Sequence, residues 1–348
     1  DMLAVLHEQV EKARSVLTPE VFDYYDAGSG DQLTRAESGA AWADYRFRPF
    51  PLRDVSAVDT ASTALGVPVA TPIAIAPSAF QRLAHPDGER ATAAAAGQAG
   101  SLFVLSTRAS LPIAEVAAAA TGPWWFQVYV MRDRELTRRV VADAVAAGAR
   151  ALVLTGDTPY VGRKRQVRGT RIPLPDDHFL VNIAPHLAPG VDGRAAAAQD
   201  PSIGLETIDW LRREFGLPVL VKGVLRGDAA DECLRAGAAG VIVSNHGGRQ
   251  LDRAVPSAHA LGDVVDAVAG RAPVYVDGGI SCGLDVLTAL ALGAHGVLIG
   301  RPVLWALAAG GCQAVADTLS AMTDDLRHAM ALTGVAGLDQ INRSLLHH

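Results

Sequence analysis

The chain has 348 residues, of which 49% are hydrophobic but only 5% aromatic, and its formal net charge at pH 7 is −6. A large core of mainly aliphatic side chains is typical of helices packed around parallel strands. The negative charge argues against a nucleic-acid-binding protein, which needs a dominant basic face.

Cysteine usage and hydropathy exclude further classes. Cys233, Cys282 and Cys312 are odd in number and far apart, without a CxxC pair. The spacing supports neither a disulfide framework nor a cysteine-rich zinc site, so we expect no metal and a reducing, cytoplasmic setting. No apolar run approaches membrane-spanning length, so we expect no membrane association.

Residues 1–70 precede the first expected barrel strand, and we expect them to form helices and a short capping ribbon. Within this extension, residues 22–25 read Phe-Asp-Tyr-Tyr and are followed by Gly28 and Gly30, a pattern that predicts a helix ending in a turn. A tyrosine pair belongs more often to a core or an interface than to a functional site, so the pattern alone does not indicate a site.

Short runs rich in β-branched residues then recur along the chain. Their bounds are 73–77, 101–106, 124–129, 151–157, 218–222, 240–246, 273–277 and 295–301. Alanine-rich segments of helical spacing separate them, and several end on a glycine just before the next run, as at Gly148 and Gly293. The alternation predicts parallel βα units, and eight such units predict a closed (β/α)8 TIM barrel.

The expected organisation is one domain over residues 1–348. It consists of the extension at 1–70, the barrel at 71–310 and C-terminal helices at 311–348. Residues 173–203, rich in Pro, Ala, Gly and Asp without a clear period, are expected to form a mobile loop that acts as a lid.

Polar residues stand at the end of nearly every run, where barrel enzymes place their sites. They are Ser78, Ser106, Gln127, Tyr129, Thr155, Asp157, Lys222, Ser244, His246, Asp277 and Arg301. A few could occur there by chance, but a polar group at nearly every end indicates a bound ligand. Glycine pairs at 278–279 and Gly300 before Arg301 predict a phosphate site after the last two strands.

The most specific motif is SNHGGRQLD at residues 244–252, directly after the apolar run 239–242. The glycines allow the backbone to approach a flat ligand, His246 can move protons near neutral pH, and Arg249 can grip a carboxylate through two hydrogen bonds. This strand end could therefore both hold and deprotonate an acid substrate.

With this motif, the chain closely resembles the FMN-dependent α-hydroxy-acid oxidases and dehydrogenases, and most of all the members that oxidise mandelate or 4-hydroxymandelate. The resemblance extends over nearly the whole chain, at residues 24–25, 75–79, 127–129, 157–159, 221–223, 244–252, 277–279 and 300–302. It implies FMN as the cofactor, a small-molecule 2-hydroxy acid and dioxygen as partners, and a homotetramer by analogy.

The resemblance also implies residue roles. His246 would be the active-site base, with Asp157 stabilising its imidazolium, and Lys222 would lie at the N1 and O2 edge of the flavin. The carboxylate and hydroxyl of the substrate would be held by Tyr24, Tyr129 and Arg249. The flavin would be lined by Pro77, Ser78, Ala79, Ser106, Gln127, Thr155, Lys222, Ser244, Asp277, Gly278, Gly279, Gly300 and Arg301.

Three positions depart from the family pattern. Lys164, flanked by Arg163 in the basic run 163–171, stands where a second carboxylate-binding arginine is usual, so either residue is a candidate. Ser281 replaces a phosphate-binding arginine, which shifts that role to Arg301 and backbone donors. Arg108 replaces an aromatic residue of glycolate oxidase, and we expect it to swing toward solvent and leave room for an aryl substrate between Phe80 and Val161.

The leading hypothesis is an oxidase that converts an aryl (S)-2-hydroxy acid to the 2-oxo acid and reduces dioxygen to hydrogen peroxide. The alternatives are a dehydrogenase of the same family that uses a quinone or other acceptor, a glycolate or lactate oxidase, and, in another class, an FMN-dependent prenyl diphosphate isomerase. A non-catalytic flavin-binding or scaffold protein is disfavoured, because a base, its acidic partner and a carboxylate grip are all present. His246 serves either a carbanion or a hydride-transfer route, so the chemical route stays open.

Overall fold

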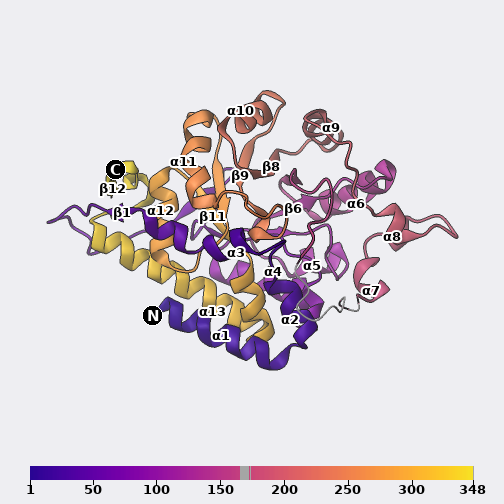
Figure 1. The fold of residues 1–348 in the computed structure, drawn as a ribbon, viewed down its shortest axis with the longest axis horizontal. Coiled ribbons are helices and arrows are strands. Elements are labelled where there is room, and N and C mark those ends of the chain that lie inside the picture. Colours follow the sequence, from indigo (N-terminus) through magenta and orange to yellow (C-terminus); the bar gives the residue numbers. More distant parts are fainter. Residues whose placement is uncertain (165–171, 173, 348) are drawn as a thin grey trace.

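A computed structural model describes residues 1–164, 172 and 174–347. Within these residues, eight parallel strands close into a barrel in the order β10-β11-β4-β5-β6-β7-β8-β9 (Figure 1). The strands are β4 (Ile73–Ile75), β5 (Phe103–Leu105), β6 (Trp124–Val128), β7 (Leu152–Thr155), β8 (Val219–Val224), β9 (Gly240–Val243), β10 (Val274–Asp277) and β11 (Gly296–Ile299). The predicted (β/α)8 barrel is confirmed, and each expected run overlaps one strand.

Helices surround the barrel in the gaps between the strands. They are α4 (Gly88–Ala99), α5 (Ile113–Ala119), α6 (Arg134–Ala147), α9 (Glu206–Phe215), α10 (Gly227–Arg235), α11 (Ser257–Val268), α12 (Gly283–Leu292) and α13 (Arg301–Thr333). Gly148 and Gly293 end α6 and α12 with φ of 110° and 111°, a left-handed conformation that glycine adopts without strain. These caps let the chain turn at once into the next strand.

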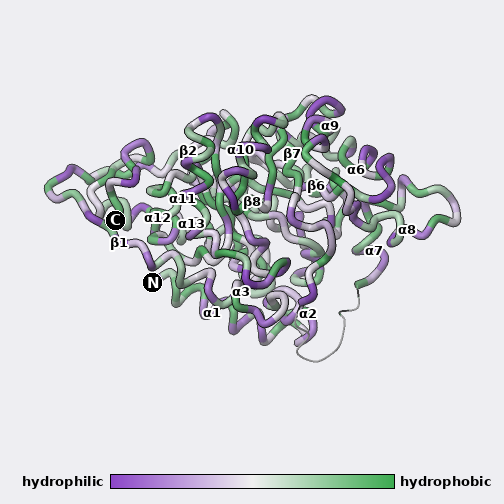
Figure 2. The backbone as a smooth tube through the Cα atoms, turned by 45° about the horizontal axis from the view of Figure 1, so that its top comes forward, coloured by the Kyte–Doolittle hydropathy of each residue, from purple (hydrophilic) through white to green (hydrophobic). Residues whose placement is uncertain are grey.

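The inside of the barrel is a packed core. Trp125 and Tyr275 meet edge to face with ring centroids 5.4 Å apart, among buried aliphatic residues of the other strands. The hairpin β2 (Ser62–Ala64) and β3 (Val67–Val69) covers this cluster with Ala64 and Val69. Figure 2 shows the hydrophobic residues concentrated in the interior and the hydrophilic ones in outer turns. The packed interior and this hairpin fill the amino end of the barrel, and the sites of such barrels lie at the other, carboxyl end of the strands.

The N-terminal extension contains α1 (Met2–Val16), α2 (Pro19–Asp26), α3 (Leu33–Glu37), the 3-10 turn η1 (Ala40–Asp44) and β1 (Arg46–Phe47). α1 packs along α13, as Figure 1 shows. Phe22 of α2 stacks on Trp305 of α13 with ring centroids 4.6 Å apart. This contact fixes α2 against the barrel, so the tyrosines at its carboxyl end face the strand ends.

The described residues of the segment 173–203, called the lid region below, contain short helices that the expected mobile loop did not include, and their role as a lid stays a prediction. The lid region contains α7 (Asp176–Phe179), the 3-10 turn η3 (Ala184–His186) and α8 (Gly193–Ala196), on one side of the molecule in Figure 1. The Asp192 side chain caps α8 by accepting hydrogen bonds from the backbone N–H groups of Arg194 and Ala195. Helices of a single turn are too short to produce a periodic hydrophobic pattern, so no pattern in the sequence predicted them.

The C-terminal segment also departs from simple helices. α13 begins at Arg301 and is kinked at Gly310 and Gly311, close to the boundary expected between the barrel and the C-terminal helices. After α13 come the 3-10 turns η5 (Leu338–Gln340) and η6 (Arg343–Leu345) and the strand β12 (Leu346–His347). β12 pairs with β1. The division of the chain into extension, barrel and C-terminal part stays a prediction. No helix in the described part of the chain combines the length and the apolar character needed to cross a membrane.

Candidate active site

A cavity of about 860 Å³ opens at the carboxyl ends of the barrel strands. Every strand contributes to its wall through residues at or just beyond its carboxyl end, and α2, α3 and the lid region complete it. Of the residues predicted to form the site, those that line the cavity are Tyr24, Pro77, Ser78, Ala79, Ser106, Gln127, Tyr129, Thr155, Lys164, Lys222, His246, Arg249, Asp277, Gly278, Gly279, Gly300 and Arg301. Asp157 and Ser244 lie directly behind this wall, where they hydrogen-bond to His246.

His246 lies in a turn that leaves β9. Its φ is 60°, and Gly247 and Gly248 follow with φ of 62° and 71°. Three successive left-handed residues bend the chain sharply, and the two glycines adopt this conformation without the clash that a Cβ atom causes. The Asn245 side chain accepts a hydrogen bond from the Gly248 N–H and closes the turn. The glycines of the motif are thus what aims His246 into the cavity.

His246 forms a pair with Asp157, whose Oδ1 lies 3.1 Å from its Nδ1. Burial lowers the pKa of His246, and the hydrogen bond and charge of Asp157 offset that effect only in part. The imidazole is therefore neutral at neutral pH and able to accept a proton. Because Asp157 engages Nδ1, Nε2 is the nitrogen left for that proton.

The carboxylate of this pair is ionised. Burial acts to raise the pKa of Asp157, but the hydrogen bond to His246 and the charges of His246 and Lys222 outweigh burial, so its pKa is below the ordinary value. Gln250 holds the same loop through a hydrogen bond from its Nε2 to the Asp157 carbonyl, at 3.0 Å. Asp157 therefore faces His246 as an anion that favours the imidazolium after proton transfer.

Lys222 and Asp277 form a second buried pair, with Nζ and Oδ2 3.2 Å apart. Burial acts to lower the pKa of Lys222, but the charges of Asp277 and Asp157 outweigh burial and raise it, so the ammonium stays charged. Its Nζ also donates to Ser244 Oγ at 3.4 Å. Asp277 Oδ1 is buried and has no hydrogen-bond partner among the described residues, so the floor of the cavity offers a free acceptor beside a fixed cation.

An amide network covers the neighbouring strand ends. Gln127 Nε2 donates to Thr155 Oγ1 at 2.8 Å, and Gln127 Oε1 accepts from the Thr107 N–H at 3.0 Å and from Ser106 Oγ at 3.3 Å. The Thr107 hydroxyl donates to the Gln127 carbonyl and accepts from the Tyr129 N–H. Sequence reasoning missed Thr107, although its position one residue beyond an expected strand end was a usable signal.

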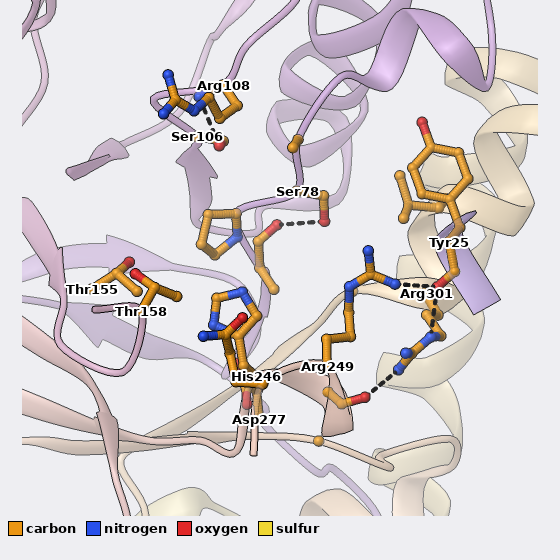
Figure 3. Close-up of a pocket in the computed structure, with 18 of the residues that line it drawn as sticks. Tyr25, Ser78, Ser106, Arg108, Thr155, Thr158, His246, Arg249, Asp277 and Arg301 are labelled. Carbon is orange, nitrogen blue, oxygen red and sulfur yellow. Dashed lines mark hydrogen bonds between the residues drawn. The ribbon is translucent and has the colours of Figure 1, made fainter. Parts of the chain in front are cut away.

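Arginines gather at the carboxyl end of α2, as Figure 3 shows for Arg249 and Arg301 beside Tyr25. Arg249 Nη1 donates to the carbonyls of Tyr24 at 2.6 Å, Tyr25 at 3.2 Å and Ala27 at 3.0 Å. Arg301 Nε donates to the Tyr25 carbonyl at 2.9 Å. The end of a helix carries partial negative charge, which stabilises both guanidinium groups in the cavity wall.

The tyrosines and Lys164 complete the region around Arg249. The guanidinium of Arg249 lies 5.1 Å from the centroid of the Tyr24 ring. Burial raises the pKa of Tyr24 and of Tyr129, so both hydroxyls keep their protons and can donate hydrogen bonds. Burial and the charge of Arg249 lower the pKa of Lys164 to about 8. Arg163, in contrast, is exposed and lies outside the cavity wall, and residues 165–171 lie outside the described part of the chain.

Arg108 does not swing toward solvent, so that expectation was wrong. The residue is only 9% exposed, and its Nη2 donates to the Ala197 carbonyl at 2.7 Å. Its guanidinium lies 4.9 Å from the centroid of the Phe179 ring, within the range of a cation–π contact. Phe80 does form part of the wall and stacks on Phe179, whereas Val161 is 68% exposed at the rim.

The glycine turns form the end of the cavity expected to hold phosphate. Gly278 and Gly279 have φ of 104° and 74°, and Trp42 Nε1 steadies their turn by donating to the Gly278 carbonyl at 2.9 Å. The backbone N–H and the hydroxyl of Ser281 both bond to Asp285. Arg35, a residue that sequence reasoning missed, enters the wall here from α3.

A family model described as FMN-dependent dehydrogenase matches residues 13–348. The chain belongs to this family. It is 43% identical to an L-lactate oxidase of Nostoc sp., with 98% of this chain and 97% of the relative covered, and 40% identical to 2-hydroxyacid oxidase 1 of Homo sapiens, with 99% and 96% covered. A solved mandelate oxidase is similar with a TM-score of 0.90 at 39% identity, with 98% of this chain and 97% of the other covered.

The residues of the cavity fit the FMN of this family. Lys222 supplies a fixed cation, and Asp277 Oδ1 is an unused acceptor suited to a hydroxyl-bearing chain. The glycine turns and Arg301 suit a phosphate, since they bring backbone N–H groups and a positive charge together. Within the described residues, no group of three His, Cys, Asp or Glu side chains is placed to hold a metal ion.

Proposed function

We propose that the protein oxidises an aryl (S)-2-hydroxy acid, such as mandelate or 4-hydroxymandelate, to the 2-oxo acid and reduces dioxygen to hydrogen peroxide. The observation that supports the proposal most is that the His246–Asp157 pair and Arg249 face one cavity. Oxidation of a 2-hydroxy acid requires a base that accepts a proton and a cation that binds the substrate carboxylate.

The substrate would be oriented by its carboxylate. Arg249 and Lys164 are two cations of the cavity wall that could bind it, and one nitrogen of Arg249 already donates to three carbonyl oxygens. The carboxylate would add charge-assisted hydrogen bonds from the guanidinium. Tyr24 and Tyr129 would donate from their protonated hydroxyls, so the hydroxyl-bearing carbon would lie beside His246.

His246 would then take a proton through Nε2, and the ionised Asp157 would stabilise the imidazolium. The proton can come from the substrate carbon or from its hydroxyl, and the same nitrogen serves both routes. Bound FMN supplies the two-electron acceptor that is reoxidised by dioxygen. Lys222, Asp277 and Gln127 would hold the ring and ribityl portions of FMN, and Arg301 with the glycine turns would hold its phosphate.

The aryl preference rests on the lid side of the wall. Phe80 and Phe179 stack with ring centroids 5.8 Å apart, and they give the cavity an aromatic surface. Burying an aryl ring against this surface would favour an aryl acid over a short one by about 1–3 kcal/mol. The likeness to solved mandelate oxidases agrees with this preference.

Steady-state assays under air test the proposal. The FMN-loaded protein should form peroxide with a higher kcat/KM for mandelate or 4-hydroxymandelate than for lactate or glycolate. A higher value for glycolate would contradict the aryl preference, and rapid reduction of a quinone beside slow reoxidation by dioxygen would indicate a dehydrogenase instead. Flavin released by heat should be FMN, without covalent linkage.

A further inference from the structure

The cavity holds a buried cation that the chemistry above does not use. Arg108 follows β5, and its backbone N–H donates to Ser106 Oγ at 3.0 Å, as Figure 3 shows. The residue is 9% exposed and contributes to the cavity wall. A guanidinium in such a place has lost most of its hydration, and that loss needs compensation by other groups.

The contacts of Arg108 compensate only in part for the hydration that its guanidinium has lost. Nη2 has the Ala197 carbonyl as its acceptor, and Nη1 is buried without a hydrogen-bond partner among the described residues. The faces of Phe179 and Tyr129 lie 4.9 Å and 5.7 Å from the guanidinium carbon. No carboxylate of the described residues forms an ion pair with Arg108, so its charge is balanced by one carbonyl dipole and two rings.

Three other cations of the same cavity have a carboxylate partner or several carbonyl acceptors, which Arg108 lacks. Lys222 pairs with Asp277, Arg35 pairs with Asp26 at 2.9 Å, and Arg249 has three carbonyl acceptors. Among these cations and Arg108, only Arg108 has a buried nitrogen without a partner. The difference indicates that Arg108 lacks an acceptor that a ligand can provide.

The position of Arg108 places that acceptor on the substrate. Its charge acts on the hydroxyls of both Tyr24 and Tyr129, where it lowers each pKa against the larger effect of burial. These are the tyrosines that would bind the reacting end of the acid. Phe179, which would contact an aryl side chain, lies over the same guanidinium, and Phe80 stacks on Phe179. Arg108 therefore lies toward the part of the cavity that the side chain of the substrate would fill.

We propose that the substrate is an aryl 2-hydroxy acid with a second anionic group on its ring, a distal carboxylate, and that Arg108 binds this group. The inference rests on the proposed function and names its substrate class more narrowly. The distal carboxylate would accept a hydrogen bond from Nη1 and compete with the Ala197 carbonyl for Nη2. Two parallel hydrogen bonds to a carboxylate suit the planar guanidinium.

The main competing explanation is that Arg108 only fastens the lid region through Ala197 and Phe179. That role would affect all substrates alike, because the lid region forms part of the cavity wall whether or not the ligand has a distal anion. A charge-binding role would affect only ligands with the distal anion. The two explanations therefore differ in a ratio of affinities and not in the overall level of activity.

The test uses two ligands that lack the 2-hydroxyl and cannot be oxidised. 4-Carboxyphenylacetate and 4-nitrophenylacetate have nearly the same shape, but only the first has a second negative charge. Dissociation constants for the FMN-loaded protein are measured from the change in flavin absorbance. We expect 4-carboxyphenylacetate to bind about 10- to 100-fold more tightly, the range that a hydrogen bond to a charged group provides. Arg108→Leu should abolish this ratio, and Arg108→Lys should keep part of it.

Arg194→Gln is the matched control. The Arg194 guanidinium also lies over the Phe179 ring, at 4.7 Å, but it is half-exposed and pairs with Asp176 of the lid region. Its replacement should change the affinity for both ligands equally and leave their ratio as in the original protein. This variant separates a disturbed lid region from a lost anion site.

Equal binding of the two ligands by the original protein would overturn the proposal, and so would a ratio that survives in Arg108→Leu. If Arg108→Leu does not fold, the ratio of the two affinities in the original protein and in Arg108→Lys still tests the proposal. Failure of the oxidation itself has a different signature. In that case neither mandelate nor 4-carboxymandelate would reduce the flavin, although the ratio for the two unreactive ligands would persist.

Discussion

The two sides of the cavity are built differently. On the strand side, His246, Lys222 and Asp277 are at or just beyond the ends of neighbouring strands, and their partners come from those same strand ends. On the lid side, Arg108, which follows β5, contacts the Phe179 ring at the end of α7 and the Ala197 carbonyl at the end of α8, and both helices have a single turn. We therefore expect the chemistry to depend on the strand side and the choice of substrate side chain to depend on the lid side.

The contacts that hold each side differ in strength. The Lys222–Asp277 pair is almost fully buried, and breaking a buried pair by removing one partner typically costs about 3–5 kcal/mol. The Arg194–Asp176 pair of the lid region is largely exposed, and such pairs contribute about 0–1 kcal/mol. Substitutions on the strand side should therefore affect catalysis most, and those on the lid side should change selectivity.

The largest effect is expected for His246→Ala. Loss of a general base typically lowers a rate about 10²- to 10⁴-fold, so anaerobic reduction of the bound flavin by the acid should slow by that amount while FMN stays bound. His259→Ala is a suitable control, because His259 pairs with Asp44 outside the cavity wall. Reduction of His246→Ala at nearly the original rate would remove the strand side from the mechanism.

A smaller effect is expected for Arg249→Lys. An ammonium cannot reproduce the planar fork that holds a carboxylate. KM for the acid should rise about 10- to 100-fold, corresponding to the 1.5–3 kcal/mol of a hydrogen bond to a charged group. Initial-rate measurements separate KM from kcat. A fall in kcat at constant KM would show that Arg249 acts in the chemical step and not in binding.

The dependence of KM on pH tests Lys164. Burial and the charge of Arg249 lower the pKa of Lys164 to about 8, so the ammonium that would attract the substrate carboxylate is present below that pH and is lost as the pH rises through it. KM should therefore increase several-fold between about pH 7 and 9. In Lys164→Arg the increase should disappear, because arginine keeps its charge. An unchanged pH profile in this variant would assign the titration to another group, and Arg163→Ala would then test the alternative residue.

The smallest effect is expected on the lid side. Phe179→Ala should lower kcat/KM for mandelate several-fold, because the aryl ring loses an aromatic contact worth about 0.5–1.5 kcal/mol. The value for glycolate, which cannot reach that wall, should stay the same. An equal loss of kcat/KM for mandelate and glycolate would mean that the lid region contributes to the chemistry, which would contradict the expected division between the strand side and the lid side.

Most of the strand side could be predicted from the sequence, because a strand end is a local feature. An apolar run ending at His246 or Asp277 fixes which residue enters the cavity, and in a parallel barrel all such ends meet at one opening. Gly148 and Gly293 likewise marked helix ends through their need for a left-handed backbone.

The lid side could not be predicted in the same way. The direction of Arg108 depends on the Ala197 carbonyl and the Phe179 ring, which lie about 70 to 90 residues farther along the chain. No local pattern carries such a contact, and single-turn helices have no period to recognise. Arg35 enters the wall from α3 for a similar reason, since the packing of the extension on the barrel places it there.

The proposed oxidation is tested most directly by an anaerobic titration of the FMN-loaded protein with (S)-mandelate. The flavin absorbance should bleach, one 2-oxo acid should form per flavin reduced, and admission of air should restore the absorbance with an equal amount of peroxide. A flavin that stays oxidised with (S)-mandelate and also with lactate and glycolate would contradict the assignment of the cavity to 2-hydroxy-acid oxidation.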